Sequence, residues 1–302
     1  MKKRKLKLQG RSYSDKIFDI VNVFVIAVLF VVFAWPLWFV LIASLSDPAA
    51  VQNGQVLLLP KGFTLEGYIY TFQSAKLWKG YLNTIGYTLA GTLLNLVLTV
   101  CCAYPLSDKN FGPRKVFIWI FMFTMYFGGG TVPTYLVVKN LGLVNTRWAM
   151  ILPGAISVYN MLVVRSYFMN SIPEALKEAA TLDGANTATY LWKIVLPLSK
   201  PVLAVVGLYY MVAHWNDFYN ALLYIYDQDL YPLQSVLREL LMNSQTQAFS
   251  DTLDTAEMIK ALDNSMLMKY CIIIVSCVPM LCAYPFVQKY FVKGMMVGSV
   301  KG

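Results

Sequence analysis

A group of polar and aromatic residues, Tyr210, His214, Trp215, Asp217 and Tyr219, lies within an otherwise apolar stretch of the sequence. If this stretch is one helix, Tyr210, His214 and Asp217 recur at i, i+4 and i+7 and share one face. Their polar groups can hydrogen-bond and the aromatic rings can contact apolar surface, so the group could bind a polyhydroxylated ligand. The same residues could instead bridge neighbouring helices or form an aromatic belt at a membrane interface.

Residues suited to catalysis are scarce. His214 is the single histidine and cannot build a His-rich metal site, and the sequence contains neither an HExxH nor a Gly-x-Ser-x-Gly motif. Three consecutive glycines at 128–130 lack the Gly-Lys-Ser/Thr of a phosphate-binding loop, so we interpret them as a helix break. We therefore expect a chain that is not an enzyme and that holds no metal.

The candidate binding residues lie in what we predict to be a membrane span. Of the 302 residues, 58% are apolar and 14% are charged, which is outside the usual balance of soluble domains. A helix of about 20 apolar residues crosses a hydrocarbon core of about 30 Å. We predict an all-α integral membrane protein with six transmembrane helices, near 17–44, 84–107, 116–138, 148–168, 201–224 and 270–291.

The distribution of lysine and arginine predicts the orientation of these spans. Basic residues are concentrated in the tail 1–16 and after the second, fourth and sixth spans, and such residues favour the cytoplasmic side. The loop 226–268 is acidic and is predicted to lie outside. Both termini are therefore predicted to be cytoplasmic, with residues 17–302 forming one membrane domain. This topology and lipid headgroups account for the net charge of +9 without a nucleic acid partner.

The segment 171–198, between the fourth and fifth spans, is helical in pattern but too polar to cross a membrane. Each charged side chain costs about 2.5 to 3.5 kcal/mol at the bilayer centre. The segment contains five of them, Glu174, Lys177, Glu178, Asp183 and Lys193. We therefore predict that it lies in the cytoplasm.

Helix signals divide this segment into two helices. Ser171 and Glu174 have the spacing of a capping box, and Gly184 stands where a left-handed residue would end the first helix. Asn186 or the residue after it could begin the second helix, which must end before Pro197.

The first of these helices has a small-residue apolar face. That face comprises Ala175, Leu176, Ala179 and Leu182. A helix of about 11 residues is marginal in water by itself, so another surface must hold it. Either the helix lies on its own bundle or it docks into another protein.

The order of residues in this segment resembles the EAA loop of binding-protein-dependent ABC importer permeases. The matching positions are Glu178, Ala179, Ala180, Gly184, Ile194, Leu196 and Pro197. The stretches 215–225, 230–240 and 291–302 also resemble the carbohydrate-uptake branch of that family, in the subunit type similar to the smaller maltose-importer permease. The resemblance covers nearly the whole chain.

The resemblance implies that the loop forms a coupling helix, seated in a cleft of an ATP-hydrolysing subunit. The residues it implicates in coupling are Glu174, Glu178, Ala179, Ala180, Asp183, Gly184, Ile194, Leu196 and Pro197. It implies four kinds of partner: a homologous permease in a heterodimer, two ATP-binding subunits, an extracellular solute-binding protein and membrane lipid. It further implies that the partner ATPases bind ATP and magnesium, that this chain has no cofactor, and that it is a multi-pass protein of the cell membrane.

Two further segments acquire expected roles. The resemblance implies that the cytoplasmic tail 292–302, with Gly294, Gly298, Lys301 and Gly302, inserts between the two ATPases; the alternative is a frayed terminus. The outer loop 226–268 contains LYPLQSVLRELL, a Pro-initiated amphipathic helix. We expect this loop to contact the solute-binding protein, although a solvated flap is an alternative.

The expected function is ATP-driven import of a sugar, most simply an oligosaccharide, with Tyr210, His214, Trp215, Asp217 and Tyr219 on the solute path. An ABC permease for another solute and a secondary transporter are the alternatives. A secondary transporter would be expected to show internal repeats and charges buried at the midplane, and few charges lie in these spans. An integral membrane enzyme would need reactive groups near one interface, and only scattered candidates exist.

Overall fold

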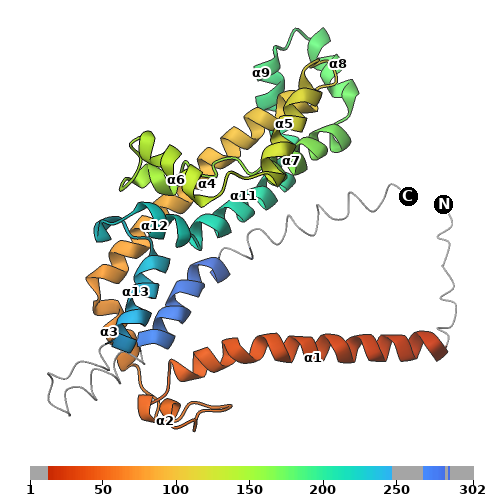
Figure 1. The fold of residues 1–302 in the computed structure, drawn as a ribbon. Coiled ribbons are helices and arrows are strands. Elements are labelled where there is room, and N and C mark those ends of the chain that lie inside the picture. The colour runs from red at the N-terminus through yellow and green to blue at the C-terminus, as the bar shows by residue number, and fades with distance from the viewer. Residues whose placement is uncertain (1–12, 247–267, 283–284, 286–302) are drawn as a thin grey trace. The chain divides into compact units, whose positions relative to one another are not determined.

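The computed structural model describes residues 13–246, 268–282 and 285, and this part of the chain is helical, without strands. It divides into two compact units (Figure 1). The first contains the described residues of 1–71 and 247–274, and the second those of 72–246 and 275–302.

The first unit is dominated by α1, Tyr13–Ala43, a helix of 31 residues that contains Pro36. Most of its apolar side chains are exposed, as a lipid-facing helix requires, and the helix agrees with the predicted first span. The short helix α2, Pro48–Gln52, follows, capped by Asp47 Oδ1, which accepts from the amide of Ala49 at 2.9 Å. Helix α3, Glu66–Gln73, leads from this unit into the second.

The second unit is built around α4, Ala75–Ser107, a helix of 33 residues that includes the predicted second span. Its N-cap is Ser74, whose hydroxyl accepts from the amide of Leu77. Helices α7, Val158–Ser171, α11, Lys200–Trp215, and α13, Leu233–Thr246, all pack against α4. Figure 1 shows α8, Glu174–Leu182, beyond one end of α4 and α13 near the other end.

Three predicted spans are not single helices. The third is divided into α5, Arg114–Tyr126, and α6, Thr131–Asn140, which are bent by 115°. The predicted glycine break is confirmed there, because the chain turns through Gly130 at φ +87°. The third predicted span is therefore a bent pair of helices and not one continuous helix.

The fourth and fifth predicted spans are also interrupted. In the fourth, a 3-10 turn, η1, Arg147–Met150, is separated from α7 by a turn through Gly154, whose φ is +74°. In the fifth, α11 ends at Trp215 and α12, Tyr219–Tyr224, begins after a break. The apolar content of these segments predicted that they lie in a membrane, but it does not indicate where the chain changes direction.

The described residues contain two helices that are long and apolar enough to cross a membrane, or up to four if each bent pair counts as one span. The last predicted span is described as helix over Met268–Cys282 only. The count of six spans and the cytoplasmic placement of both termini stay predictions.

The second unit has two apolar clusters. One lies where α4, α7, α11 and the segment after α8 meet, with Ala103, Met161, Val164, Tyr190 and Val206 buried in it. The other surrounds η1 and α12 and includes Tyr87, Met150, Ala221 and Tyr224. The first cluster fixes the base of the predicted coupling loop.

Candidate functional site

Helix α8 is the first helix of the predicted coupling loop, and its start differs from the prediction. Ser171 is the last residue of α7 and Glu174 is the first of α8, so they flank a helix break. The N-cap is Pro173, which has no side-chain cap bond. The predicted capping box is therefore wrong, and the carboxylate of Glu174 bonds to Lys109 instead.

The end of α8 agrees with the prediction. Gly184 has φ +74° and its amide donates to Thr181 O at 3.1 Å, while the amide of Ala185 donates to Ala180 O at 2.9 Å. These two bonds form a Schellman motif, in which a left-handed residue closes the helix. No heavy atom lies within 4 Å of a Cβ atom built at Gly184, so the backbone conformation alone favours glycine here.

The second helix of the loop starts at Asn186, whose Oδ1 accepts from the amide of Thr189 at 2.7 Å, as predicted. It runs through α9, Thr187–Tyr190, then a π-helical segment, η2, Leu191–Val195, and then α10, Leu196–Leu198. The predicted end before Pro197 is wrong. A proline ring clashes with the carbonyl four residues earlier in a regular α-helix, and the wider π turn before Pro197 displaces that carbonyl.

The predicted apolar face of α8 is uncovered within the described part of the chain. Ala175, Leu176, Ala179, Leu182 and Glu178 are exposed, and Leu182 is 89% exposed. The helix is attached through buried Ala180, which lies at the edge of this face, one turn after Leu176. The described residues therefore do not bury the apolar face of α8 against the chain's own bundle, which was the first of the two expected alternatives.

The other residues predicted for coupling divide between surface and interior. Asp183 and Pro197 are exposed. Ile194 and Leu196 are half-buried, and Ile194 packs against the first apolar cluster. The loop therefore presents Glu178, Asp183 and the small residues of α8 outward, and anchors its second helix inward through Tyr190 and Val195.

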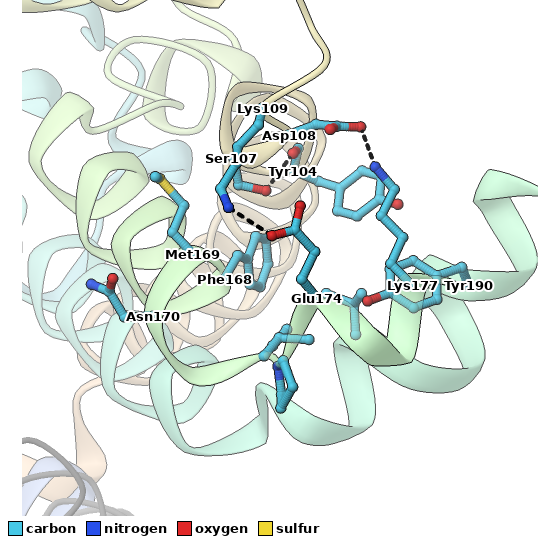
Figure 2. Close-up of a pocket in the computed structure, with 13 residues that line it drawn as sticks. Tyr104, Ser107, Asp108, Lys109, Phe168, Met169, Asn170, Glu174, Lys177 and Tyr190 are labelled. Atoms are coloured by element: carbon cyan, nitrogen blue, oxygen red, sulfur yellow. Dashed lines mark hydrogen bonds and ion pairs between the residues drawn. The ribbon is translucent and has the colours of Figure 1, made fainter. Parts of the chain in front are cut away.

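A pocket of about 310 Å³ lies under the start of α8, between it and the end of α4 (Figure 2). Two ion pairs join these elements: Lys109 Nζ is 2.6 Å from Glu174 Oε2, and Lys177 Nζ is 2.6 Å from Asp108 Oδ2. The hydrogen bond from Lys177 lowers the pKa of Asp108 below its ordinary value, so the carboxylate is ionised at neutral pH. Sequence reasoning missed Asp108 and Lys109 because their partners lie more than 60 residues away in the chain.

The predicted solute-path residues are not brought onto one face. Tyr210 is buried, its hydroxyl lies 2.8 Å from that of Thr99, and it accepts from the amide of Ser157 at 3.1 Å. His214 Nε2 lies 3.1 Å from the side-chain amide of Asn95 on α4. Both residues therefore bridge helices, as in the alternative reading of the sequence.

Helices α4 and α11 approach each other closely at Gly91, and this explains how the His214 ring fits between them. A Cβ atom added to Gly91 would collide with the imidazole ring. With its oxygen toward His214, the amide of Asn95 donates to Gly91 O at 2.8 Å and to Ala155 O at 3.2 Å. These bonds join α4, α11 and the segment before α7.

Trp215 is also interior, because its indole Nε1 donates to Ser276 O at 3.2 Å and the ring is buried. Asp217 lies beyond the end of α11, so the predicted i+7 relation is wrong. Its carboxylate instead accepts from the backbone amide of Asn220, in the first turn of α12, at 3.1 Å and from the side-chain amide of Asn220 at 2.8 Å. Tyr219 is exposed and its hydroxyl is 3.2 Å from that of Thr131. Of the five, Tyr219 is exposed near the break, and Asp217 is half-buried like His214.

The first part of the outer loop is held against α4. The amide of Leu233 donates to Thr84 Oγ1 at 2.7 Å, and Lys76 pairs with Glu239 at 2.7 Å. A Cβ atom at Gly80 would lie 3.0 Å from Val236, which marks close packing of α13 on α4. The predicted amphipathic helix is therefore present as α13, directly after Pro232.

Other predicted sites lie outside the described residues. These are the rest of the outer loop, 247–267, and the tail residues Gly294, Gly298, Lys301 and Gly302. Within the described part, no group of three or more His, Cys, Asp or Glu side chains could hold a metal.

Comparisons with known proteins connect this geometry to a family. Residues 116–296 match the family described as binding-protein-dependent transport system inner membrane component. The chain is 37% identical to Protein LplC of Bacillus subtilis (strain 168), with 96% of each chain covered. It is 35% identical to the polygalacturonan/rhamnogalacturonan transport system permease protein YtcP of the same strain, over 95% of this chain and 99% of YtcP.

A solved structure is similar as well. It is a chain of a bacterial ABC transporter involved in the import of the acidic polysaccharide alginate, with a TM-score of 0.84 and 32% identity over 94% of this chain and 99% of that one. The family match spans more than half of the chain, and the relatives match almost all of it. The resemblance read from the EAA loop is thus confirmed, and the chain belongs to the family of inner-membrane permease components of binding-protein-dependent ABC importers.

Proposed function

We propose that this chain is one of two homologous permease subunits of an ATP-driven importer, and that its solute is an oligosaccharide. Supporting this, YtcP is named for transport of polygalacturonan and rhamnogalacturonan, and the similar solved structure imports alginate. The solute crosses the membrane unchanged, and ATP is bound with magnesium and hydrolysed by two partner ATPases. An extracellular binding protein delivers the solute.

Coupling to the ATPases is assigned to α8. The observation that carries this assignment is the exposed apolar face of a short, capped helix, beside the exposed carboxylate of Glu178. Alanine side chains allow close approach of a partner backbone, and a carboxylate offers a charge-assisted hydrogen bond to a cationic partner. Closure of the ATPase dimer would move α8, and the attached helices would follow.

In this proposal both termini and α8 lie in the cytoplasm and the chain crosses the membrane six times, within one membrane domain, residues 17–302. The solute path passes the break between α11 and α12, where Tyr219 is exposed and Asp217 is half-buried. The outer loop 226–268 contacts the binding protein. The tail 292–302 inserts between the ATPases.

The test is Glu178→Lys, with Glu66→Lys as the control because Glu66 is an exposed carboxylate outside the loop. Glu178→Lys should abolish uptake of labelled oligosaccharide in a strain lacking the native chain, and the ATPases should copurify less. Membrane insertion should be unchanged, since a charge outside the bilayer does not hinder it. Normal uptake and normal copurification with Glu178→Lys would overturn the assignment of α8.

A further inference from the structure

The covalent connections of α8 to the membrane helices are interrupted on both sides. Before α8 the chain breaks at Ile172 and Pro173. After α8 it passes the left-handed Gly184, a π-helical segment and a bend of 80° between Thr187–Leu198 and Lys200–Trp215. Turns of this kind absorb changes in backbone angle, so α8 could pivot about them without moving α4.

Apolar packing does not remove this freedom at the start of α8. The pocket of about 310 Å³ lies there, lined by Tyr104 and Phe168 among others, so the space under the helix is incompletely filled. Buried Ala180 attaches the later part of the helix. The start of α8 therefore needs another attachment to keep a fixed orientation.

The ion pairs Lys109–Glu174 and Asp108–Lys177 supply that attachment (Figure 2). Glu174 and Lys177 are three residues apart and lie on one helix face, while Asp108 and Lys109 are consecutive residues just after α4. The end of α4 carries one negative and one positive side chain, and α8 carries one of each in the complementary order. A shift of α8 that moved Lys177 to Lys109, or Glu174 to Asp108, would therefore place like charges together. The arrangement fixes register as well as distance.

Isolated exposed pairs contribute little, but the Asp108–Lys177 pair has two features that strengthen it. Its side chains are only 35% and 39% exposed. Asp108 Oδ1 also accepts from the amide of Asn110 at 3.0 Å, which orders the carboxylate before it meets the lysine. Close by, Arg165 Nε donates to Leu106 O at 2.9 Å and ties α7 to the same end of α4.

We propose that these two ion pairs form a latch that makes α8 and α4 one mechanical unit, with Asp108, Lys109, Glu174 and Lys177 as positioning residues. The inference rests on the proposed coupling role of α8. Helix α4 has 33 residues and a length of about 50 Å, and its other end holds α13 through Thr84 and Lys76. The latch therefore provides a direct route between the outer loop and the ATPase-facing helix.

The latch predicts how the binding protein stimulates ATP hydrolysis in the complete reconstituted complex. Asp108→Lys and Lys177→Asp should each lower the ratio of stimulated to basal hydrolysis by about two- to fivefold, the range that such pairs supply. The double variant Asp108→Lys with Lys177→Asp should restore part of the ratio, because the pair is re-formed with reversed sign while the bond from the Asn110 amide is lost. Asp108→Asn should also lower the ratio of stimulated to basal hydrolysis. Because it adds no repulsive charge, it tests the latch even where a charge-reversal variant misfolds.

Lys193→Asp is the matched control, because Lys193 is an exposed lysine of the same loop whose side chain is outside the latch. It should leave the ratio near that of the unmodified complex. Unchanged ratios in the single variants, or a double variant as low as the singles, would refute the latch.

A second measurement is independent of the coupling role of α8. Spin labels at Thr181 on α8 and at Gly112 beyond the end of α4, both exposed, should give a narrow distance distribution in the intact complex. The distribution should broaden in Asp108→Lys and narrow again in the double variant. If it follows this pattern while Glu178→Lys transports normally, the latch stands and the proposed function fails; if the distribution never changes, the latch fails by itself.

Discussion

Substitution of Gly184 tests whether the shape of the loop after α8 is needed for transport. Its φ of +74° lies in the left-handed region, which costs an L-residue about 1–2 kcal/mol. A Cβ atom there meets nothing within 4 Å, so the size of the new side chain should matter little. We therefore expect Gly184→Ala and Gly184→Leu to have similar effects, and Gly184→Asn to be milder because asparagine tolerates this conformation.

The cost is large enough to detect. About 1–2 kcal/mol lowers the population of the native turn, relative to competing turns, by about 5- to 30-fold. The Schellman bonds from Gly184 and Ala185 would weaken, and the end of α8 would fray. Uptake should therefore fall to a small fraction in the alanine and leucine variants while the chain still inserts in the membrane.

The assay is uptake of labelled oligosaccharide in a strain without the native chain, normalised to the amount of each variant in the membrane. Gly142→Ala is the matched control, because Gly142 has φ +69° and open surroundings but lies in the turn after α6. It should carry a similar backbone cost and transport normally. Full uptake by Gly184→Leu, or a Gly184→Asn variant as inactive as Gly184→Leu, would refute the reasoning.

Three other predictions follow from the site. Trp215→Ala should lower the free energy of unfolding by about 3–5 kcal/mol and reduce the yield of the complex, because the indole is buried; a normal yield with altered solute preference would contradict this packing role. Asp217→Asn keeps an oxygen that can accept from Asn220, so stability should persist while competition between solutes in uptake changes; unchanged competition would remove Asp217 from the solute path. Lys177 lowers the pKa of Asp108, so their pair contributes fully above the ordinary carboxyl pKa of about 4 and is lost as the pH falls through the lower folded value. The difference in melting temperature between the native chain and Asp108→Asn should therefore shrink below about pH 4, and a difference that stays constant down to about pH 2 would contradict the linkage.

The long apolar helices could be predicted from the sequence because hydropathy measures what they contact. Helices α1 and α4 need only length and apolar surface, and both appear where the apolar runs lie. Breaks inside apolar runs are decided by a few backbone angles, which do not alter mean hydropathy. The break after Trp215 had a local signal that the apolar run obscured: Asn216 and Asp217 are residue types that favour the start of a helix.

The structure of the proposed coupling loop was predictable where its signals are local. Gly184 and Asn186 act on atoms within five residues, and both caps formed as expected. The capping box failed because Pro173 fixes the backbone between Ser171 and Glu174, and Glu174 finds a lysine 65 residues away. Such a pairing depends on where the end of α4 lies, which the local sequence does not determine.

The polar residues of α4 explain why the predicted solute stripe became an interhelical contact. Thr84, Asn95 and Thr99 lie on the side of α4 that meets α13 and α11, and they bond the amide of Leu233, His214 and Tyr210 respectively. In a hydrocarbon environment a lost bond of this kind is not replaced by water, so α4 cannot separate from α11 without leaving buried polar groups unpaired. We therefore expect α4 and α11 to tilt together during transport. We also expect a solute path to open on other surfaces, and the break after α11, where Tyr219 is exposed and Asp217 is half-buried, is our candidate.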